Sequence, residues 1–417
     1  MNSLVVVAVI LAVSPAAAQS SLTIEQAQRL AVERSRMIVA QDAAVTASRE
    51  MAVAAGQLPD PVATIGVNNL PINGQDAWSF TADFMTMRSV GVMQEFTHSK
   101  KREARVERFE READRSTAER ALTIANIQRD TALAWIDRYY AEAQASVVQE
   151  QMGQTRLELD AADAAYRAGR GSLAEILSGR SALVSLDDRQ RELVRRARAA
   201  RATLARWVGE AADAPLAGKP DIGAIRLDPR TLDTDIAHHP DLMVLASREE
   251  VAAAEVKIAQ ASKQADWSVS VMYSQRGPAY SNMVSLNASV PLQWDQRNRQ
   301  DREVAAKLAM LDQVRAERED MVRAHAAEIR AMVVAWQDDR ERLVRYEREL
   351  VPLARERTEA TVAAYRGAKA TLGEVLQSRR SEIDVRLQAL QLETEIARTW
   401  AQLNFLVPID HASRSGR

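Results

Sequence analysis

The sequence predicts a mainly α-helical chain built from two tandem copies of one unit, ordered helix, strand, strand, very long helix, turn and helix. Three observations carry this prediction. Prolines are nearly absent from two long stretches, one motif occurs twice at corresponding places, and four short segments alternate apolar and polar side chains. Such patterns predict long helices, a tandem repeat and short strands, respectively.

The composition excludes several classes of protein. The 417 residues are 47% hydrophobic and 27% charged, with 55 Lys and Arg against 57 Asp and Glu. That apolar content is enough to build a core, which excludes a disordered chain. The net charge of −2 does not favour a nucleic-acid binder. Because the chain has no Cys, disulfides, thiolate metal sites, a cysteine nucleophile and a lipidated N-terminal cysteine are all excluded.

Residues 1–18 are expected to be a cleaved export signal. Leu4–Val13 is an apolar stretch of secretory length, and Ala16–Ala18 offers an A-x-A cleavage site. The segment before the apolar stretch has no Lys or Arg, which departs from the usual signal. After Gln19 there is no run of 18 apolar residues, so no transmembrane helix is predicted.

Two very long helices are predicted, over 97–168 and 295–366. The first stretch contains no proline, and the second contains only Pro352, which we expect to kink its helix. Apolar residues recur at three- and four-residue spacing and charges fill the other faces, which is typical of coiled coils and too polar for lipid. Shorter helices are predicted over 23–57, 172–208, 240–263 and 371–406.

Four short strands are predicted between the helices. In the second copy, the segments 267–273 and 284–290 alternate apolar and polar side chains on either side of a Gly-Pro turn. In the first copy, the segments 62–67 and 89–96 occupy the corresponding places, joined by a longer loop. Alternation of this kind gives each hairpin one apolar and one polar face.

The internal repeat fixes the domain organisation. Residues 165–177 read AYRAGRGSLAEIL, and residues 364–376 read AYRGAKATLGEVL at an offset of 199. Two further segment pairs match at offsets of 201 and 205. We therefore expect a first repeat over 19–215, a second over 216–408 and a tail over 409–417.

Two such repeats, with this motif between the long helix and the returning helix of each, resemble the TolC-like outer-membrane efflux proteins. The resemblance covers residues 20 to about 408. The segment 83–96, followed by the basic run 100–102, is similar to the heavy-metal branch of that family, the CzcC/CusC-like members. Two departures stand out: the run reads Lys-Lys-Arg where Gly-Lys-Arg is frequent, and the lipidated cysteine of many relatives is missing.

The resemblance implies a homotrimer in the outer membrane of a Gram-negative bacterium. Four strands from each chain would close a 12-stranded transmembrane β-barrel, because four strands alone leave edges that lipid cannot satisfy. The helices would continue as an α-helical barrel across the periplasm. A periplasmic adaptor (membrane fusion protein) would connect this duct to an inner-membrane pump of the resistance-nodulation-division class. The expected function is passive conduction, most specifically of heavy-metal cations, without catalysis or a cofactor.

Glu175 and Glu374 are the candidate residues of the periplasmic aperture. Each lies one helical turn past its tip motif, where family members carry acidic residues at the constriction. Three chains would supply six carboxylates, and such a ring attracts cations and repels itself. Ser178 and Gln377 lie three residues further on, on roughly the same face. The alternative is that both glutamates are ordinary solvated side chains.

The tip motifs themselves are the candidate adaptor-docking sites. Glycine permits the tight turn, and Ser172 and Thr371 are expected to cap the returning helices. The alternative is that the motif only makes a stable turn. The docking candidates are Arg167, Gly169, Gly171, Ser172, Leu173, Gly367, Thr371 and Leu372.

Methionine and histidine positions raise the question of a metal site. We interpret five methionines in and near the strands as packing residues rather than soft-metal ligands; they are Met85, Met87, Met93, Met272 and Met283. His238 and His239 form the only adjacent pair, while His98, His325 and His411 are scattered. No metalloprotease-like spacing occurs, so neither a catalytic zinc site nor another metal site is predicted.

Alternatives to a metal-efflux duct remain at this point. A duct of the same family for drugs, solvents or proteins is compatible with the same residues. A soluble periplasmic coiled-coil scaffold, or an adaptor-like protein, is the alternative from another class. An adaptor should show one helical hairpin rather than two full copies, and the alternating segments also favour the channel.

Overall fold

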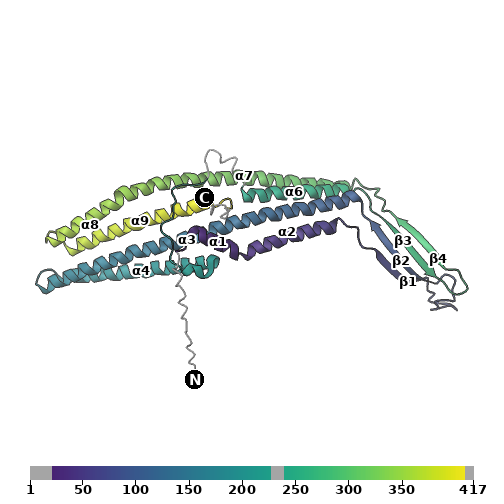
Figure 1. Ribbon diagram of the computed structural model, residues 1–417, viewed down its shortest axis with the longest axis horizontal. Coiled ribbons are helices and arrows are strands. Elements are labelled where there is room, and N and C mark those ends of the chain that lie inside the picture. The colour runs from purple at the N-terminus through teal and green to yellow at the C-terminus, as the bar shows by residue number, and fades with distance from the viewer. Residues whose placement is uncertain (1–20, 227–238, 409–417) are drawn as a thin grey trace, which may run out of the picture. The chain divides into compact units, whose positions relative to one another are not determined.

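A computed structural model describes residues 21–226 and 239–408 of the chain (Figure 1). The expected signal, the tail, His238 and His411 lie outside the described residues. The chain divides into two compact units, each of which takes segments from both repeats. One unit holds residues 21–35, 124–226 and 329–408, and the other holds residues 36–123 and 239–328.

The first repeat starts with two helices where one was predicted. Helix α1 spans Ile24–Arg34 and begins with a capping box between Thr23 and Gln26. Ser35 then takes an extended conformation (φ −70°, ψ 115°), which ends α1, and α2 spans Arg36–Ala55. The single helix expected over 23–57 was therefore wrong at Ser35, because one residue outside the helical region of φ and ψ interrupts the hydrogen-bond ladder.

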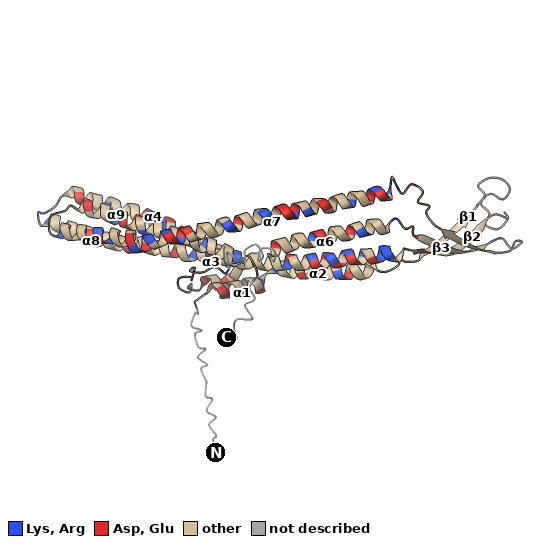
Figure 2. Cartoon of the chain, turned by 90° about the horizontal axis from the view of Figure 1, so that it is seen from above, with Lys and Arg blue, Asp and Glu red and all other residues tan. Residues whose placement is uncertain are grey.

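The first long helix agrees with its prediction. Helix α3 spans Ser99–Arg167, 69 residues, and α4 returns over Leu173–Val208 before a short 3-10 turn at Gly209–Asp213. Proline-free sequence with charges on the outer faces permits such lengths. Figure 2 shows Lys and Arg interspersed with Asp and Glu along the long helices.

The second repeat has the same order of elements with one irregularity. Helix α6 spans Pro240–Ala261, α7 spans Gln300–Arg345, α8 spans Val351–Arg366 and α9 spans Leu372–Asn404. Between α7 and α8 lies a π-helical segment, Tyr346–Leu350, in which the Val351 N–H bonds to the Tyr346 carbonyl. Pro352 follows directly and has no N–H to donate, so the wider π turn falls at the place where a disturbance was predicted.

The four strands of the two predicted hairpins form one antiparallel sheet. They are β1 (Val62–Asn68), β2 (Met87–Phe96), β3 (Trp267–Gln275) and β4 (Met283–Ser289), in the order β1-β2-β3-β4 (Figure 1). Strand β2 of the first repeat pairs with β3 of the second from Arg88↔Gln275 to Phe96↔Trp267. Strands β1 and β4 are the edges of this sheet.

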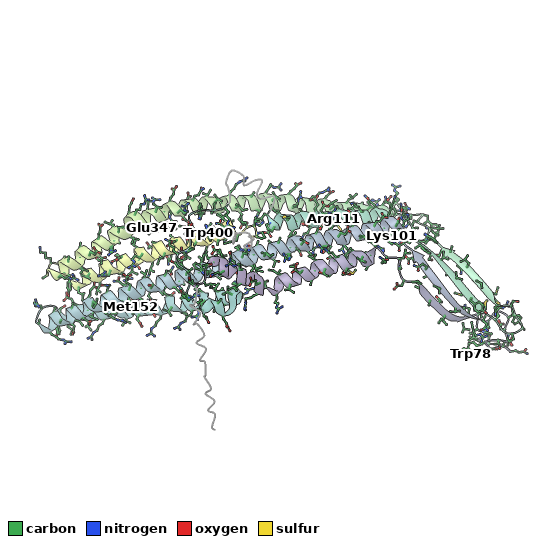
Figure 3. All side chains as sticks on the ribbon, in the orientation of Figure 1. Trp78, Lys101, Arg111, Met152, Glu347 and Trp400 are labelled. Atoms are coloured by element: carbon green, nitrogen blue, oxygen red, sulfur yellow. The ribbon has the colours of Figure 1, made fainter. Side chains whose placement is uncertain are left out.

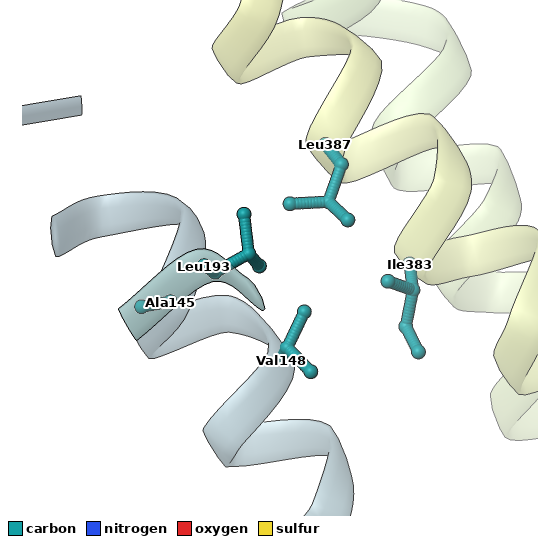
Figure 4. Packing of buried hydrophobic residues seen from close by; sticks show 5 residues of the cluster. All are labelled: Ala145, Val148, Leu193, Ile383 and Leu387. Atoms are coloured by element: carbon teal, nitrogen blue, oxygen red, sulfur yellow. The ribbon is translucent and has the colours of Figure 1, made fainter. Parts of the chain in front are cut away.

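A contiguous core joins three helices of the first unit. Ala145 and Val148 of α3, Leu193 of α4, and Ile383 and Leu387 of α9 are buried against one another (Figure 4). Each buried aliphatic side chain of this kind stabilises by about 1.5–3 kcal/mol relative to exposure. The cluster therefore holds the helices of both repeats together within this unit.

The N-terminal segment of the same unit is fixed by polar contacts. Leu22 forms a parallel bridge with Leu216, and the buried Trp135 indole donates to the Leu22 carbonyl over 2.9 Å. Arg138, also buried, donates to the Ala212 carbonyl over 2.7 Å. These bonds satisfy backbone carbonyls that water cannot reach.

In the second unit, a salt bridge ties the start of α3 to the start of β3. The ammonium of Lys101, a residue labelled in Figure 3, lies 2.5 Å from Asp266, and the His98 N–H also donates to that carboxylate. Burial alone would raise the pKa of Asp266, but these two donors hold it below its ordinary value. Phe96 and Trp267 stack with ring centroids 4.3 Å apart at the same end of the sheet. The junction between helix and sheet is thus both charged and aromatic.

No helix within residues 21–226 and 239–408 is long and apolar enough to cross a bilayer.

Candidate functional sites: the helical tips and the apolar sheet

The first tip, residues 165–178, is a Schellman turn followed by a capped helix. Gly169 takes φ +73° as the α3 helix ends, its N–H bonds to the Tyr166 carbonyl, and the Arg170 N–H bonds to the Ala165 carbonyl. This is the pair of bonds that defines the motif, and its left-handed residue favours glycine. Gly171 also takes a positive φ, +104°. The expectation that glycine permits this turn is confirmed.

The second tip, residues 364–377, makes the same turn with a different residue in the left-handed position. Lys369 bonds to the Ala364 carbonyl and Ala368 bonds to the Tyr365 carbonyl, but the residue with positive φ is Ala368, at 56°. Gly367 has φ −85°, which any residue adopts. The role given to Gly367 in the turn was therefore wrong, because the glycine stands one residue before the position that needs it.

Both returning helices begin with a capping box, as expected. The Ser172 hydroxyl accepts from the Glu175 N–H over 3.3 Å, and the Glu175 carboxylate accepts from the Ser172 N–H over 3.0 Å. Thr371 and Glu374 repeat the pattern, with distances of 3.3 and 2.7 Å. Backbone and hydroxyl donation from Thr371 lowers the pKa of Glu374. Both glutamates therefore have a local structural role at the start of the returning helices.

The leucine after each cap has opposite surroundings in the two tips. Leu173 is 54% exposed, whereas Leu372 is 0% exposed. An added Cβ at Gly179 of α4 would lie 3.7 Å from a Leu372 methyl group, so Leu372 lies close to that glycine. Arg167, also exposed, pairs with Asp163 on its own helix. Leu173 and Arg167 are therefore open to a partner, while Leu372 is part of the core.

Ser178 and Gln377 come together in one pocket lined by α3, α4 and α9. Its volume is about 470 Å³, and Glu175 and Glu374 are not among the residues that line it. Three guanidinium groups line it as well, those of Arg189, Arg379 and Arg380. Arg379 pairs with Glu158 over 2.9 Å and Arg189 with Asp384 over 2.8 Å. The pocket is thus a polar site near the start of the two returning helices.

The middle of the sheet carries two wholly apolar rows on one face. By strand register, two rows of side chains cross all four strands on one face: Ile65, Val90, Tyr273 and Val284, and beside them Ala63, Val92, Val271 and Leu286. Ile65 is 83% exposed and Leu286 is 73% exposed. We call these eight residues the apolar face.

The opposite face of the sheet is mostly small and polar. Its rows run across paired residues such as Gly66, Ser89, Ser274 and Met283. Met87, Met93 and Met272 lie on this face too, whereas Met85 lies in the loop before β2. Their interpretation as packing residues stays a prediction. Trp78, in the same β1–β2 loop, is exposed at the sheet end of the second unit (Figure 3).

One group of chemistry-bearing residues was missed by the sequence reasoning. His239, Asp241 and His325 each place one ligand atom within 4.8 Å of the others. Two of them flank the start of α6 and the third lies far along α7. No spacing rule connects such distant residues. Only the antiparallel alignment of the two helices would have revealed the group.

Solved structures similar to this chain are outer-membrane channels. The outer-membrane channel OprN matches with a TM-score of 0.75 at 16% identity, covering 93% of this chain and 90% of its own. CusC, described for transmembrane channel formation, matches with a TM-score of 0.75 at 15% identity, covering 93% and 92%. The open-state MtrE outer-membrane channel of Neisseria gonorrhoeae matches with a TM-score of 0.73 at 14% identity, covering 92% and 88%.

No protein-family model matches the sequence. No curated protein matches it at a significant level either. At these identities the structural likeness shows the fold, which is that of the TolC-like outer-membrane channels and agrees with the predicted one.

Proposed function

We propose that this protein is the outer-membrane channel of a tripartite efflux system. The apolar face is the observation that carries the proposal. Eight side chains in register, crossing four strands, are open on the single chain. Exposed contiguous apolar surface of this kind signals a membrane or protein partner. The small polar residues on the opposite face then suit a water-filled lumen, the division seen in transmembrane β-barrels.

The open edges of the sheet support a trimer. Strands β1 and β4 leave unpaired backbone groups, which lipid cannot satisfy. Pairing β1 of one chain with β4 of the next, three times, would close 12 strands. The same apolar face is unfavourable for the alternative, a water-soluble periplasmic scaffold, since that protein would have to cover it with another surface.

We assign the helical tips to the periplasmic end of the duct. The exposed Arg167, Gly169, Gly171 and Leu173 would meet the adaptor in the first repeat. In the second repeat, Leu372 is buried, so docking there would use Gly367 and Thr371 at the surface. The pump partner would be of the resistance-nodulation-division class.

Glu175 and Glu374 would form the ring of carboxylates at the aperture. The lowered pKa of Glu374, caused by Thr371, keeps that group negative. Its capping role limits its motion, so the ring would act through fixed charge rather than through side-chain swinging. Ser178 and Gln377, which share one pocket, would line the next layer. Conduction then needs no chemistry from the protein.

Heavy-metal cations are the proposed cargo, on the strength of the sequence resemblance of residues 83–102. CusC and OprN match the fold with the same TM-score of 0.75, so the fold does not separate the metal branch from the others. A duct for drugs, solvents or proteins is the second candidate. Deleting the gene should sensitise cells to particular metals, whereas normal metal tolerance with lost drug tolerance would replace the metal assignment by the second candidate.

Conductance in planar bilayers tests the aperture. The double variant Glu175→Gln/Glu374→Gln should lower the preference for cations over anions, because six charges leave the ring. The matched control, Glu303→Gln/Glu319→Gln, removes the same number of charges from α7 and should leave the preference unchanged. Equal selectivity in wild type and the tip variant would sink the carboxylate ring while leaving the channel itself in place.

A further inference from the structure

We propose that His239, Asp241 and His325 form a binding site for a divalent transition-metal ion, most specifically Zn²⁺, that fastens α6 to α7. The inference is independent of the proposed channel function. Imidazole nitrogens and a carboxylate oxygen, without sulfur, are a ligand set that zinc uses, with a water in the fourth position. The three ligand atoms lie within 4.8 Å of one another.

A ladder of ion pairs sets the register that brings the two histidines together. Three ion pairs join the two segments in antiparallel order. Lys263, just after α6, pairs with Asp301 of α7 over 2.6 Å, and within α6 Glu255 pairs with Lys307 over 2.6 Å and Glu249 with Arg315 over 2.8 Å. The next position in this antiparallel series is the histidine pair, whose ring centroids are 4.3 Å apart. The three ion pairs therefore fix the alignment of α6 and α7 that places the two histidines side by side.

The individual atoms are placed for coordination. His239 Nδ1 lies 3.6 Å from Asp241 Oδ2. Ligand atoms of a tetrahedral zinc site, with bonds of about 2.0–2.1 Å, lie about 3.3 Å apart. The present contact of His239 Nδ1 is a long one, 3.3 Å from the Asp241 N–H that it caps. Small rotations of the His239 and Asp241 side chains would therefore bring both ligand atoms to an ion. The weak hydrogen bond from the Asp241 N–H to His239 Nδ1 would be lost.

His325 supplies the third ligand through Nε2. This atom is buried and has no hydrogen-bond partner among the described residues, although the side chain as a whole is 16% exposed. A buried, unpaired ring nitrogen is costly, and a metal ion would satisfy it. Its other nitrogen, Nδ1, lies 3.9 Å from Glu328 Oε2. A carboxylate at this side can hold Nδ1 protonated and orient the ring, as is usual for metal-bound histidine.

The site belongs to the second repeat alone. At the repeat offsets of 205 and 201, the positions of His239 and His325 correspond to Arg34 and Ile124. Neither residue type is a ligand for this ion. The half-exposed Asp241 side chain gives the ion a path from solvent.

Metal titration of the full-length protein tests the proposal. Protein purified without a polyhistidine tag and stripped with a chelator should bind one Zn²⁺ per protomer in competition with a fluorescent chelator. Co²⁺ at the same site should show the visible absorption of a four-coordinate ion. His325→Gln should weaken Zn²⁺ binding at least tenfold and abolish that absorption. Glu328→Gln should weaken it by about tenfold.

The control is His98→Gln, which removes a histidine of the same unit that lies outside the cluster. It should bind Zn²⁺ like the wild type. The unfolding temperature without metal shows whether each variant is folded, and a Zn²⁺-dependent rise should occur in wild type and His98→Gln only. Wild-type affinity in a folded His325→Gln, or no stoichiometric Zn²⁺ binding by the wild type, would overturn the site.

Discussion

The two tips share a motif and differ in nearly everything that the motif does not specify. Both end the long helix with the same pair of backbone bonds and begin the next helix with the same capping box. Yet the left-handed residue is Gly169 in the first tip and Ala368 in the second. The leucine after the cap is exposed in the first and buried in the second. Local hydrogen bonding thus follows the repeated sequence, while burial follows the surroundings of each copy.

The largest expected effect is a difference in the free energy of unfolding between alanine variants of the two leucines. Leu372→Ala removes a fully buried side chain and should lower the free energy of unfolding by about 2–5 kcal/mol. Leu173→Ala trims an exposed one and should change it by less than about 0.5 kcal/mol. Thermal unfolding at one fixed protomer concentration measures both. An equal loss for the two variants would show that Leu173 is covered in the assembled protein.

Smaller changes in stability, opposite in sign between the two tips, are expected at the residues with positive φ, Gly169 and Ala368. Gly169→Ala should lower the stability of the first tip by about 1 kcal/mol, and Ala368→Gly should raise that of the second by about the same amount. No neighbouring atom lies within 4 Å of an added Cβ at Gly169, so only the backbone conformation is tested there. Amide hydrogen exchange across each tip reports the change.

The control for this pair is Gly367→Ala. With φ at −85° and ordinary contacts of 3.5 Å for the new Cβ, it should not destabilise the tip. Faster exchange in Gly367→Ala than in Gly169→Ala would contradict the assignment of the left-handed residue.

The smallest expected effect is the pH dependence of the stability of the second tip. Because hydrogen bonds from Thr371 hold the pKa of Glu374 below its ordinary value, this carboxylate contributes stability above the ordinary pKa of about 4.3. The contribution is lost as the pH falls through the lowered pKa. The difference in exchange rate at the second tip between wild type and Glu374→Gln should therefore be full at neutral pH and disappear in strong acid. A difference that persists unchanged in acid would show that the charge is not what stabilises the cap.

Local features of the fold could be read from the sequence. Helix α3 was expected over 97–168 and spans Ser99–Arg167, because no proline interrupts this stretch, apolar residues recur at helical spacing along it, and Gly169 follows its end. The break at Ser35 could not be foreseen, since neither glycine nor proline marks it. The capping of Ser172 and Thr371 followed from residue type and spacing alone.

Features that depend on distant parts of the chain did not follow from local patterns. The pairing of β2 with β3 joins two repeats; the family resemblance implied that all four strands belong to one barrel, but the alternation within each hairpin did not give this pairing or its register. The same limit hid the group of His239, Asp241 and His325, which depends on the alignment of two helices. Conversely, the tip glutamates were singled out as aperture residues from the family resemblance, and the structure adds a capping role that their spacing from Ser172 and Thr371 already contained.

The most direct test of the central claim is the mass and location of the mature protein. Cells should be fractionated, and the protein extracted in mild detergent and weighed intact by native mass spectrometry. The account predicts an outer-membrane protein of three protomers, in which the apolar face meets lipid and the β1 and β4 edges are paired. A water-soluble periplasmic monomer or dimer would contradict it, and would mean that another surface covers the apolar face.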